Sequence, residues 1–229
     1  MSDVTSAELQ SRREKLAELR LDCGAHGSFE EGHCAMELVS WLAGRPFTDA
    51  PPCVSPVIRN FLLQLNDILG DDRRQRLKPV LVKVLQTVGT AEQEQQRVYI
   101  LADFAARVAT PAAFRAIGVE TWAVLLESLH EVVDLETKVQ SEFFLYSANA
   151  AATAAATGSA RAATGAACDA SAAACAASAA AYAARAASAA AYAAASDASD
   201  AAYAARDDVW DRLLPHCLSA LERMCSIGR

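Results

Sequence analysis

The chain has 229 residues, of which 53% are apolar and 21% are charged, and its formal net charge at pH 7 is -7. This length has room for one or two domains. Acidic and basic residues are interspersed, whereas proteins that bind nucleic acids gather Lys and Arg on one face, so the composition argues against a DNA or RNA partner.

The sequence pattern also indicates the cellular compartment of the protein. Residues 2–19 form a polar, amphipathic stretch, unlike the apolar run of a signal peptide. The later alanine-rich stretch is interrupted by Asp, Arg and Ser, which a membrane-spanning helix would avoid. Seven cysteines, an odd number, are dispersed along the chain and favour reduced thiols over a disulfide framework. We therefore expect a cytoplasmic protein with no membrane partner.

Apolar residues recur at helical spacing along the first 135 residues, without the alternation of a half-buried strand. The expected helices run from Ser6 through Leu19, from Ser28 to Gly44, from Ser55 to Gly70, from Asp72 to Thr87, from Thr90 through Val108, and from Gly118 through Leu135. A further helix start is expected at Thr110. The Pro-rich residues 45–56 form a connector. An all-α fold is therefore predicted.

Capping residues and prolines mark several of these helix starts. Ser28-Phe29-Glu30-Glu31 and Thr90-Ala91-Glu92-Gln93 have the form of capping boxes. Ser55-Pro56 and Thr110-Pro111 pair a cap with a first-turn proline. Pro79 is expected to kink its helix or to mark its true start. The β-branched stretch from Val80 to Val88 leaves a strand as an alternative there.

Alanine dominates residues 148–206 and is the best helix former, because it loses no side-chain entropy on folding. A single helix over this length would be about 90 Å long, far longer than a compact domain of this size. Breaks are expected at Thr157-Gly158, at Thr164-Gly165 and at residues 196–200, which leaves shorter helices folded back on one another. Bare alanine faces let helices approach closely and favour tight packing within or between chains.

The last segment, residues 207–227, reads as an amphipathic helix that returns to cover the N-terminal core. The predicted organisation is an N-terminal helical bundle, residues 1–147, followed by an alanine-rich helical array with a closing helix, residues 148–229. Thr153 and Thr164 also have the spacing of alanine-rich helical antifreeze proteins, so ice binding is an alternative. The spacing of eleven residues between threonines does not continue, because the position eleven residues after Thr164 is Cys175.

Cysteine and histidine side chains near the start of the chain suggest a metal site. Cys23 and His26 have a metal-ligand spacing, and Cys34 or Cys53 would complete a zinc site if the connector folds back. Structural zinc sites usually supply their ligands in two such pairs, and the sequence has no second pair. Buried thiols and a helix-capping histidine are the alternative reading, so no cofactor is predicted and zinc is kept as an alternative.

A thiol nucleophile is a second chemical alternative. Cys34 follows the expected Ser28 cap within two turns, where the helix dipole would lower the pKa of the thiol, and His26 and His33 are near in sequence. The sequence has no Gly-rich phosphate loop, nucleophile elbow or Ser-His-Asp pattern. Enzyme activity is therefore an alternative that no complete motif supports.

Two Glu-x-x-His spacings occur, at Glu30 with His33 and at Glu127 with His130. Paired motifs of this kind supply the ligands of di-iron helical bundles. Glu30 and His33 fall in the expected first turn of a helix, with Gly32 between them, which favours a solvated helix start over a core site.

One block of residues carries a resemblance to a known group. The block comprises Cys34-Ala35-Met36-Glu37, Ala43-Gly44, Asp49, Pro52-Cys53, Pro56-Val57 and Asn66-Asp67. With the alanine-rich tail and the closing helix, it resembles a group of uncharacterised alanine-rich proteins of bacteria and their phages. The resemblance implies an architecture and no mechanism, and it singles out Cys34, Glu37, Asp49 and Cys53 as a set. Glu37 would cap or pair with backbone groups of the connector, and Asp49 would anchor its turn.

Taken together, these patterns predict a non-enzymatic binding or scaffolding protein that acts through helix-helix contacts with a protein partner or with itself. The candidate binding residues are His26, Glu37 and Asp49. The alternative is a metal-dependent or thiol enzyme that uses the region from Cys23 to Cys53, with Cys23, His26, Cys34 and Cys53 as metal ligands.

Overall fold

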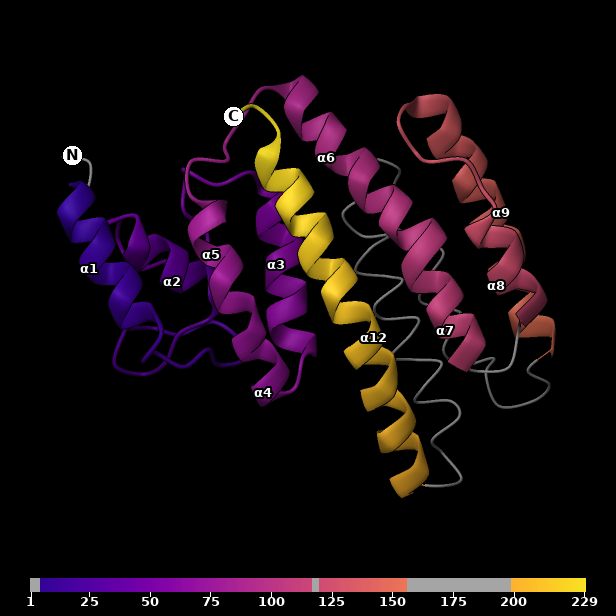
Figure 1. Cartoon of the computed structure of the whole chain (residues 1–229), viewed down its shortest axis with the longest axis horizontal. Helices are drawn as coiled ribbons and strands as arrows, with labels where there is room; N and C mark the ends of the chain where they lie inside the picture. The colour runs from indigo at the N-terminus through magenta and orange to yellow at the C-terminus, as the bar shows by residue number, and fades with distance from the viewer. Residues whose placement is uncertain (1–4, 117–119, 156–198) are drawn as a thin grey trace. The chain divides into compact units, whose positions relative to one another are not determined.

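The structure is a computed structural model that describes residues 5–116, 120–155 and 199–229, and within them it contains helices and no strand (Figure 1). The elements are α1 (Ser6–Leu16), α2 (Ala35–Leu42), α3 (Pro56–Ile68), α4 (Asp71–Arg74), the 3-10 turn η1 (Gln75–Leu77), α5 (Lys78–Val84), α6 (Ala91–Phe104), the π turn η2 (Ala105–Ala109), α7 (Thr110–Ala116), α8 (Glu120–Glu127), α9 (Leu135–Ala155) and α12 (Ser199–Ser226). The all-α prediction is confirmed. None of the described helices is both long enough and apolar enough to cross a membrane.

The chain divides into two compact units. The first unit combines Met1–Arg97 with Leu221–Arg229, and the second comprises Val98–Ala220. The predicted boundary between residues 147 and 148 falls inside α9. Much of the predicted C-terminal part, residues 156–198, lies outside the described residues, so that division stays a prediction.

The core of the first unit forms around α2 and α3. Nearly every residue of α2 is buried, and α3 places Ile58, Phe61, Leu62 and Leu65 on one buried face with helical spacing. The helix α2 packs against both α3 and α5. Removal of these apolar side chains from water stabilises the first unit at about 25 cal/mol for each Å² buried.

The C-terminal end of the chain is part of the first unit. The buried guanidinium of Arg97, on α6, donates hydrogen bonds to the carbonyl oxygens of Met224 at 3.2 Å and Ile227 at 3.1 Å. Lys83, on α5, pairs with Glu222 at 2.6 Å. The two Arg97 bonds go to carbonyl groups in the last turn of the helix and just after it, where intrahelical donors run out. The prediction that the last helix returns to the N-terminal core is confirmed for these residues, and Figure 1 shows this end of α12 beside α3 and α5.

Two predicted helix starts are confirmed by their caps. The Ser55 hydroxyl accepts a hydrogen bond from the Ile58 amide at 3.3 Å, and Pro56 is the first residue of α3. The Thr90 hydroxyl accepts from the Gln93 amide at 3.3 Å, and the Gln93 side chain accepts from the Thr90 amide at 2.8 Å. In both cases the side chains satisfy amide groups that a helix start leaves unpaired.

The predicted start of the second helix at Ser28 is wrong, because α2 begins at Ala35. The carboxylate of Glu31 accepts from the Gly27 amide at 3.0 Å instead of capping Ser28. Gly32 has a φ of 145°, which no helix contains. The capping box forms later, between Cys34 and Glu37.

Prolines have different effects at two of the predicted boundaries. Pro79 stands in the first turn of α5, after the breaks at α4 and η1, so it marks a true helix start as predicted. The strand alternative for the stretch that begins at Val80 is wrong, because α5 continues to Val84.

Thr110 does not start a new helix: the chain stays helical through the π turn η2 into α7. The wider π turn ends at Ala109, two residues before Pro111, which cannot donate a backbone hydrogen bond.

The second unit contains α7, α8 and α9. The predicted helix from Gly118 through Leu135 is wrong in its extent, because α8 ends at Glu127 and α9 begins at Leu135. Asp134 caps the new helix, since its carboxylate accepts from the Thr137 amide at 2.9 Å. The core of this unit contains Phe114, Ala123, Leu126 and Ala148, with Trp122, Leu129, Phe144 and Leu145 packed against it.

The alanine-rich segment is described only at its two ends. Residues 148–155 are helical as part of α9, and residues 201–206 are helical as part of α12, as predicted. The predicted break at residues 196–200 lies partly outside the described residues, and its last two residues begin α12. The predicted breaks at Thr157-Gly158 and Thr164-Gly165 lie outside the described residues. Thr164 of the ice-binding alternative lies outside them as well, so that alternative stays a prediction.

Candidate functional site

The buried carboxylate of Glu37 gathers the residues before α2. Its Oε1 accepts a hydrogen bond from the His26 amide at 2.7 Å, and its Oε2 accepts from the Cys34 amide at 2.7 Å. The Nδ1 of His26 lies 2.9 Å from the same Oε2. Burial by itself raises the pKa of Glu37, but the hydrogen bonds from the His26 and Cys34 amides outweigh burial and lower this pKa. Glu37 therefore holds the preceding loop to the start of α2 as a carboxylate.

Cys34 is the N-cap of α2 and is fully buried. Its sulfur accepts a hydrogen bond from the Glu37 amide at 3.4 Å. Burial raises the pKa of the Cys34 thiol to about 12. The expectation that the helix dipole lowers this pKa is wrong, because desolvation of a thiolate in this apolar site outweighs the first-turn amides. Cys34 is placed as a helix cap, with its thiol protonated at neutral pH.

Asn66, near the end of α3, extends this cluster. Its Oδ1 accepts from the Ala35 amide at 3.1 Å, and its Nδ2 donates to the Asp22 carbonyl oxygen at 2.9 Å. The neighbouring Asp67 carboxylate accepts from the Gly24 amide at 3.0 Å. Asn66 and Asp67 were not among the predicted site residues. The available signal was a polar residue on the otherwise apolar face of α3.

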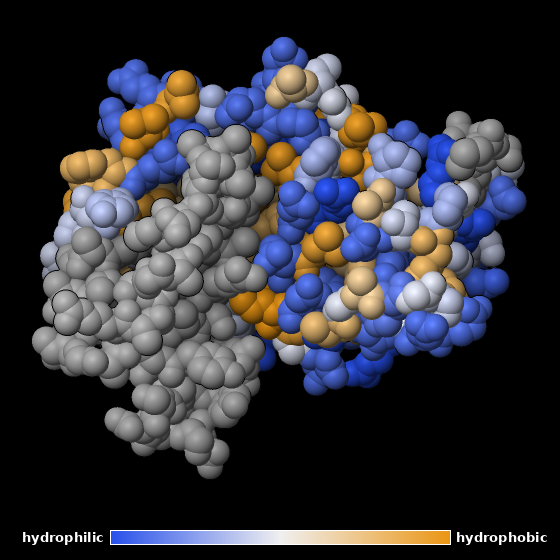
Figure 2. All heavy atoms as spheres, turned by 180° about the vertical axis from the view of Figure 1, so that it is seen from behind, coloured by the Kyte–Doolittle hydropathy of each residue, from blue (hydrophilic) through white to orange (hydrophobic). Residues whose placement is uncertain are grey.

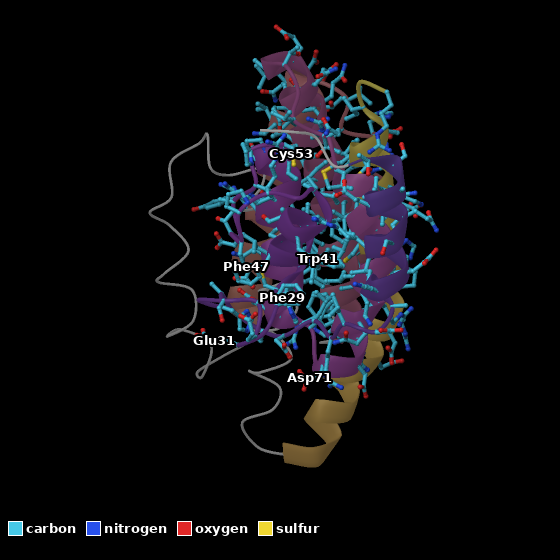
Figure 3. The ribbon with its side chains drawn as sticks, turned by 90° about the vertical axis from the view of Figure 1, so that its left-hand side faces the viewer. Phe29, Glu31, Trp41, Phe47, Cys53 and Asp71 are labelled. Carbon is cyan, nitrogen blue, oxygen red and sulfur yellow. The ribbon has the colours of Figure 1, made fainter. Side chains whose placement is uncertain are left out.

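The structure brings only some of the predicted site residues together. Among the residues that it describes, no group of three or more His, Cys, Asp or Glu side chains is arranged to hold a metal ion. Cys23 is exposed, with its sulfur 3.6 Å from the Asp67 carbonyl oxygen. Figure 3 shows Cys53 far from Glu31 in the view, so the connector does not carry Cys53 to the loop of Glu31.

Asp49 and Cys53 do not belong to the hydrogen-bonded cluster of His26, Cys34 and Glu37. Asp49 is half-buried in the connector and takes no part in the hydrogen bonds of that cluster. Cys53 is buried, and its carbonyl oxygen accepts from the Val88 amide at 3.2 Å. The zinc set of Cys23, His26, Cys34 and Cys53 stays a prediction that no feature of this geometry supports.

A cluster of aromatic rings covers the loop that precedes α2. The ring centroid of Phe29 lies 4.1 Å from that of His33, 5.7 Å from that of Trp41 and 6.1 Å from that of Phe47. Figure 3 shows Phe29, Trp41 and Phe47 close to one another. Arg12 of α1 lies over the Trp41 ring, 5.7 Å from its centroid, and also donates to the Trp41 carbonyl oxygen. These contacts pack the loop and α1 against α2.

Glu127, which belongs to one Glu-x-x-His motif, is already engaged. Both of its carboxylate oxygens accept hydrogen bonds from Arg115. These bonds lower the pKa of Glu127. The Glu127 carboxylate is therefore bound to Arg115 of α7. This geometry gives the di-iron alternative no support at Glu127.

The second candidate site is an apolar stripe on α9, which we call the α9 stripe. Its members recur at i, i+4, i+8 and i+11, a spacing that places them on one side of a helix over about three turns. Large parts of their surfaces are exposed: 64% for Leu135, 55% for Val139, 67% for Phe143 and 73% for Tyr146. Figure 2 shows apolar side chains at the surface at its upper left, on the side where α8 and α9 lie.

The buried residues of α9 include polar side chains as well as apolar ones. Lys138, Ser141 and Ala148 are buried, although Lys and Ser usually occupy the solvent side of a helix. Lys138 is paired with Glu142, and the Ser141 hydroxyl donates to the Lys138 carbonyl oxygen at 2.8 Å. The helix α9 thus packs Phe144 and Leu145, together with small and polar residues, against the second unit, and leaves a second set of aliphatic and aromatic residues exposed. Exposed apolar surfaces of this kind mark interaction sites.

Comparisons of the chain with protein-family models, with curated proteins and with solved structures found no match. The resemblance to alanine-rich proteins of bacteria and their phages stays a prediction.

Proposed function

We propose that this protein is a non-enzymatic binding or scaffolding protein that acts through helix-helix contacts, and that the α9 stripe is its contact surface. The observation that carries the proposal is the orientation of α9, which exposes Leu135, Val139, Phe143 and Tyr146 while burying Lys138 and Ser141. An apolar stripe that repeats every three to four residues is the pattern by which one amphipathic helix docks on another.

The α9 stripe is held in place by the rest of the second unit. Asp134 and Thr137 cap the helix start, and Phe144 and Leu145 pack against the buried cluster around Leu126. The side chains of the α9 stripe are therefore presented by an anchored helix, which lowers the entropic cost of binding compared with a segment that orders on contact.

The cluster around Glu37 supports a structural role rather than chemistry. Its carboxylate accepts backbone hydrogen bonds, and the thiol of Cys34 is buried with its pKa raised. A reactive thiol needs an exposed site that favours the thiolate. The enzyme alternative for the region from Cys23 to Cys53 therefore has less support than the interaction surface.

Site-specific photo-crosslinking in cells tests the proposal. A benzophenone amino acid in place of Phe143 is expected to form a discrete adduct of defined mass on irradiation. The matched control carries the same group in place of Gln140, which is exposed on α9 but lies away from the α9 stripe. Absence of a discrete adduct from position 143, or equal adducts from both positions, would show that the α9 stripe is not a binding surface.

A further inference from the structure

The helix α1 is attached to the first unit along one narrow face. Within residues 5–20 the buried side chain is that of Leu16. Leu9, Arg12 and Leu19 are half-buried, and the other residues of this range are exposed. Leu9, Arg12 and Leu16 are three and four positions apart, a spacing that places them on one side of a helix. Figure 1 shows α1 beside α2, against which it packs. The contact has the form by which a separate amphipathic helix docks on a protein surface.

The attachment of α1 buries little apolar surface. One of the eleven residues of α1 is buried, against seven of the eight residues of α2. Polar contacts also hold α1 in place. The guanidinium of Arg12 lies over the Trp41 ring and donates to the Trp41 carbonyl oxygen. The Nζ of Lys78 donates to the Ala17 carbonyl oxygen at 3.1 Å. Elements with few buried apolar contacts open at a lower free energy than the core does, so we expect α1 to detach before the rest of the first unit unfolds.

The chain is fixed again soon after α1. Leu21 is fully buried, and its amide and carbonyl groups exchange two hydrogen bonds with the Gln75 side chain, both at 2.9 Å. Before it, the Arg20 carbonyl oxygen lies 3.3 Å from Nδ1 of His33. Residues 17–19 form a turn between α1 and this anchor. Rotation about these residues would move α1 and leave the loop before α2 in place.

From these observations we propose that α1 is a displaceable lid, and that the face of α2 beneath it binds an amphipathic helix of a partner protein. Because α1 fits this face, its own side chains define the chemistry of the partner helix. That helix carries two leucines seven positions apart, and an arginine three positions after the first leucine lies over Trp41. The lid and the partner compete, and the partner binds only those molecules in which the lid is open. This inference goes beyond the proposed function, because it adds a surface in the first unit that the chain itself covers.

Fluorescence anisotropy tests the lid with a fluorescein-labelled peptide of residues 5–20, titrated with the full-length protein. The tethered α1 competes at an effective concentration on the order of millimolar, so the wild type is expected to bind the peptide weakly. Leu16→Ala in the protein removes the buried anchor of the lid and should tighten peptide binding roughly tenfold or more. Arg13→Gln in the protein, at an exposed position of α1, is the matched control and should bind as the wild type does. If Leu16→Ala loses the helical circular dichroism spectrum, Arg12→Gln gives the same test at a half-buried position.

Changes in the peptide test the same contacts without altering the fold of the protein. Against the lid variant, a peptide with Leu16→Glu is expected to bind roughly tenfold more weakly or worse. A peptide with Arg12→Gln is expected to bind roughly threefold more weakly or worse. A peptide with Arg13→Gln should bind as the unchanged peptide does. Equal binding of all these peptides, or no binding of the unchanged peptide at about 1 millimolar, would overturn the docking face on α2.

Two further outcomes would overturn other parts of the proposal. Equal affinity of the peptide for the wild type and for the lid variant would overturn the lid, because loss of a competitor must raise the affinity. A wild type that sediments as a dimer, and that excess unlabelled peptide converts to monomer, would make α1 of a second copy the occupant of the face. That result would overturn the partner protein.

Discussion

The backbone N–H of Cys34 donates a hydrogen bond to the Glu37 carboxylate at 2.7 Å, and the N–H of Glu37 donates back to the Cys34 sulfur at 3.4 Å. This reciprocal pair is a capping box in which a thiol takes the place of the usual hydroxyl. Because the same carboxylate also binds His26, a single side chain holds both the start of α2 and the middle of the loop before it.

Glu37→Gln is expected to destabilise the first unit. The amide keeps one acceptor oxygen where the carboxylate has two, so at least one of the bonds from the His26 amide, the Cys34 amide and the His26 ring is lost inside the protein. Leaving a buried donor without an acceptor costs about 1 to 3 kcal/mol. We expect a loss of about 2 kcal/mol in the free energy of unfolding, measured by urea denaturation followed by circular dichroism. Glu18→Gln, at an exposed site, is the control, and an equal effect of the two changes would contradict the assigned role.

The lowered pKa of Glu37 gives its contribution a definite dependence on pH. The pKa of Glu37 in the folded state lies below its ordinary value of 4.5, so the unfolded chain binds this proton more readily. The stability due to the ionised group is then fully present above about pH 5 and is lost as pH falls through the folded pKa. Denaturation from pH 7 down to pH 3 should show a smaller loss for Glu37→Gln than for the wild type. Parallel curves for the two proteins would argue against an ionised, hydrogen-bonded Glu37.

Thiol reactivity should separate two cysteines that stand eleven positions apart. Cys23 is exposed, whereas Cys34 is buried and burial raises its pKa to about 12. In native protein at pH 8, iodoacetamide should modify Cys23 within minutes and leave Cys34 unmodified until the protein unfolds. Peptide mapping by mass spectrometry assigns the modification to each site. Labelling of Cys34 as fast as Cys23 would mean that the thiol is open to solvent and would revive the nucleophile alternative.

Arg97 is expected to contribute strongly to the stability of the first unit. Its guanidinium is 1% exposed and bonds to Glu94 and to the carbonyl oxygens of Met224 and Ile227. Arg97→Met keeps an unbranched apolar side chain but removes the guanidinium donors, although the Glu94 carboxylate still accepts from Ser55 and the Met224 carbonyl oxygen from the Ile227 amide. We expect the free energy of unfolding to fall by about 2 to 3 kcal/mol.

Limited proteolysis gives a second measurement of the same change. The last residues of α12 should be cleaved faster in Arg97→Met than in the wild type, because the bonds that hold their carbonyl groups are gone. Arg13→Met, at an exposed position of α1, is the matched control. Unchanged cleavage near Met224 in Arg97→Met would refute the anchoring role.

The sequence predicted the helical fold and those helix starts whose caps use common residues. Ser55 with Pro56 and Thr90 with Gln93 both act as expected, because hydroxyl caps and first-turn prolines depend only on neighbours in the chain. Ser28 with Glu31 failed for a reason that is also local. The backbone at Gly32 is left-handed, and the competing cap at Cys34 uses a residue type that cap statistics do not favour.

The candidate sites were harder to predict because they depend on contacts between distant segments. Asn66 meets the Ala35 amide across thirty-one positions, and nothing in α3 alone specifies that partner. The α9 stripe was missed for a different reason. Both faces of α9 carry apolar side chains, such as Phe143 and Phe144, so periodicity alone does not tell which face packs inward.

Gly32 has a consequence for the start of α2. A Cβ atom at position 32 would lie 2.6 Å from Cδ2 of His26 and 3.0 Å from a carboxylate oxygen of Asp22. Any larger residue would therefore displace the His26 ring that Glu37 holds, in addition to the strain of a left-handed backbone. Two capping signals compete in this segment, and the residue that selects between them is the one that has no side chain.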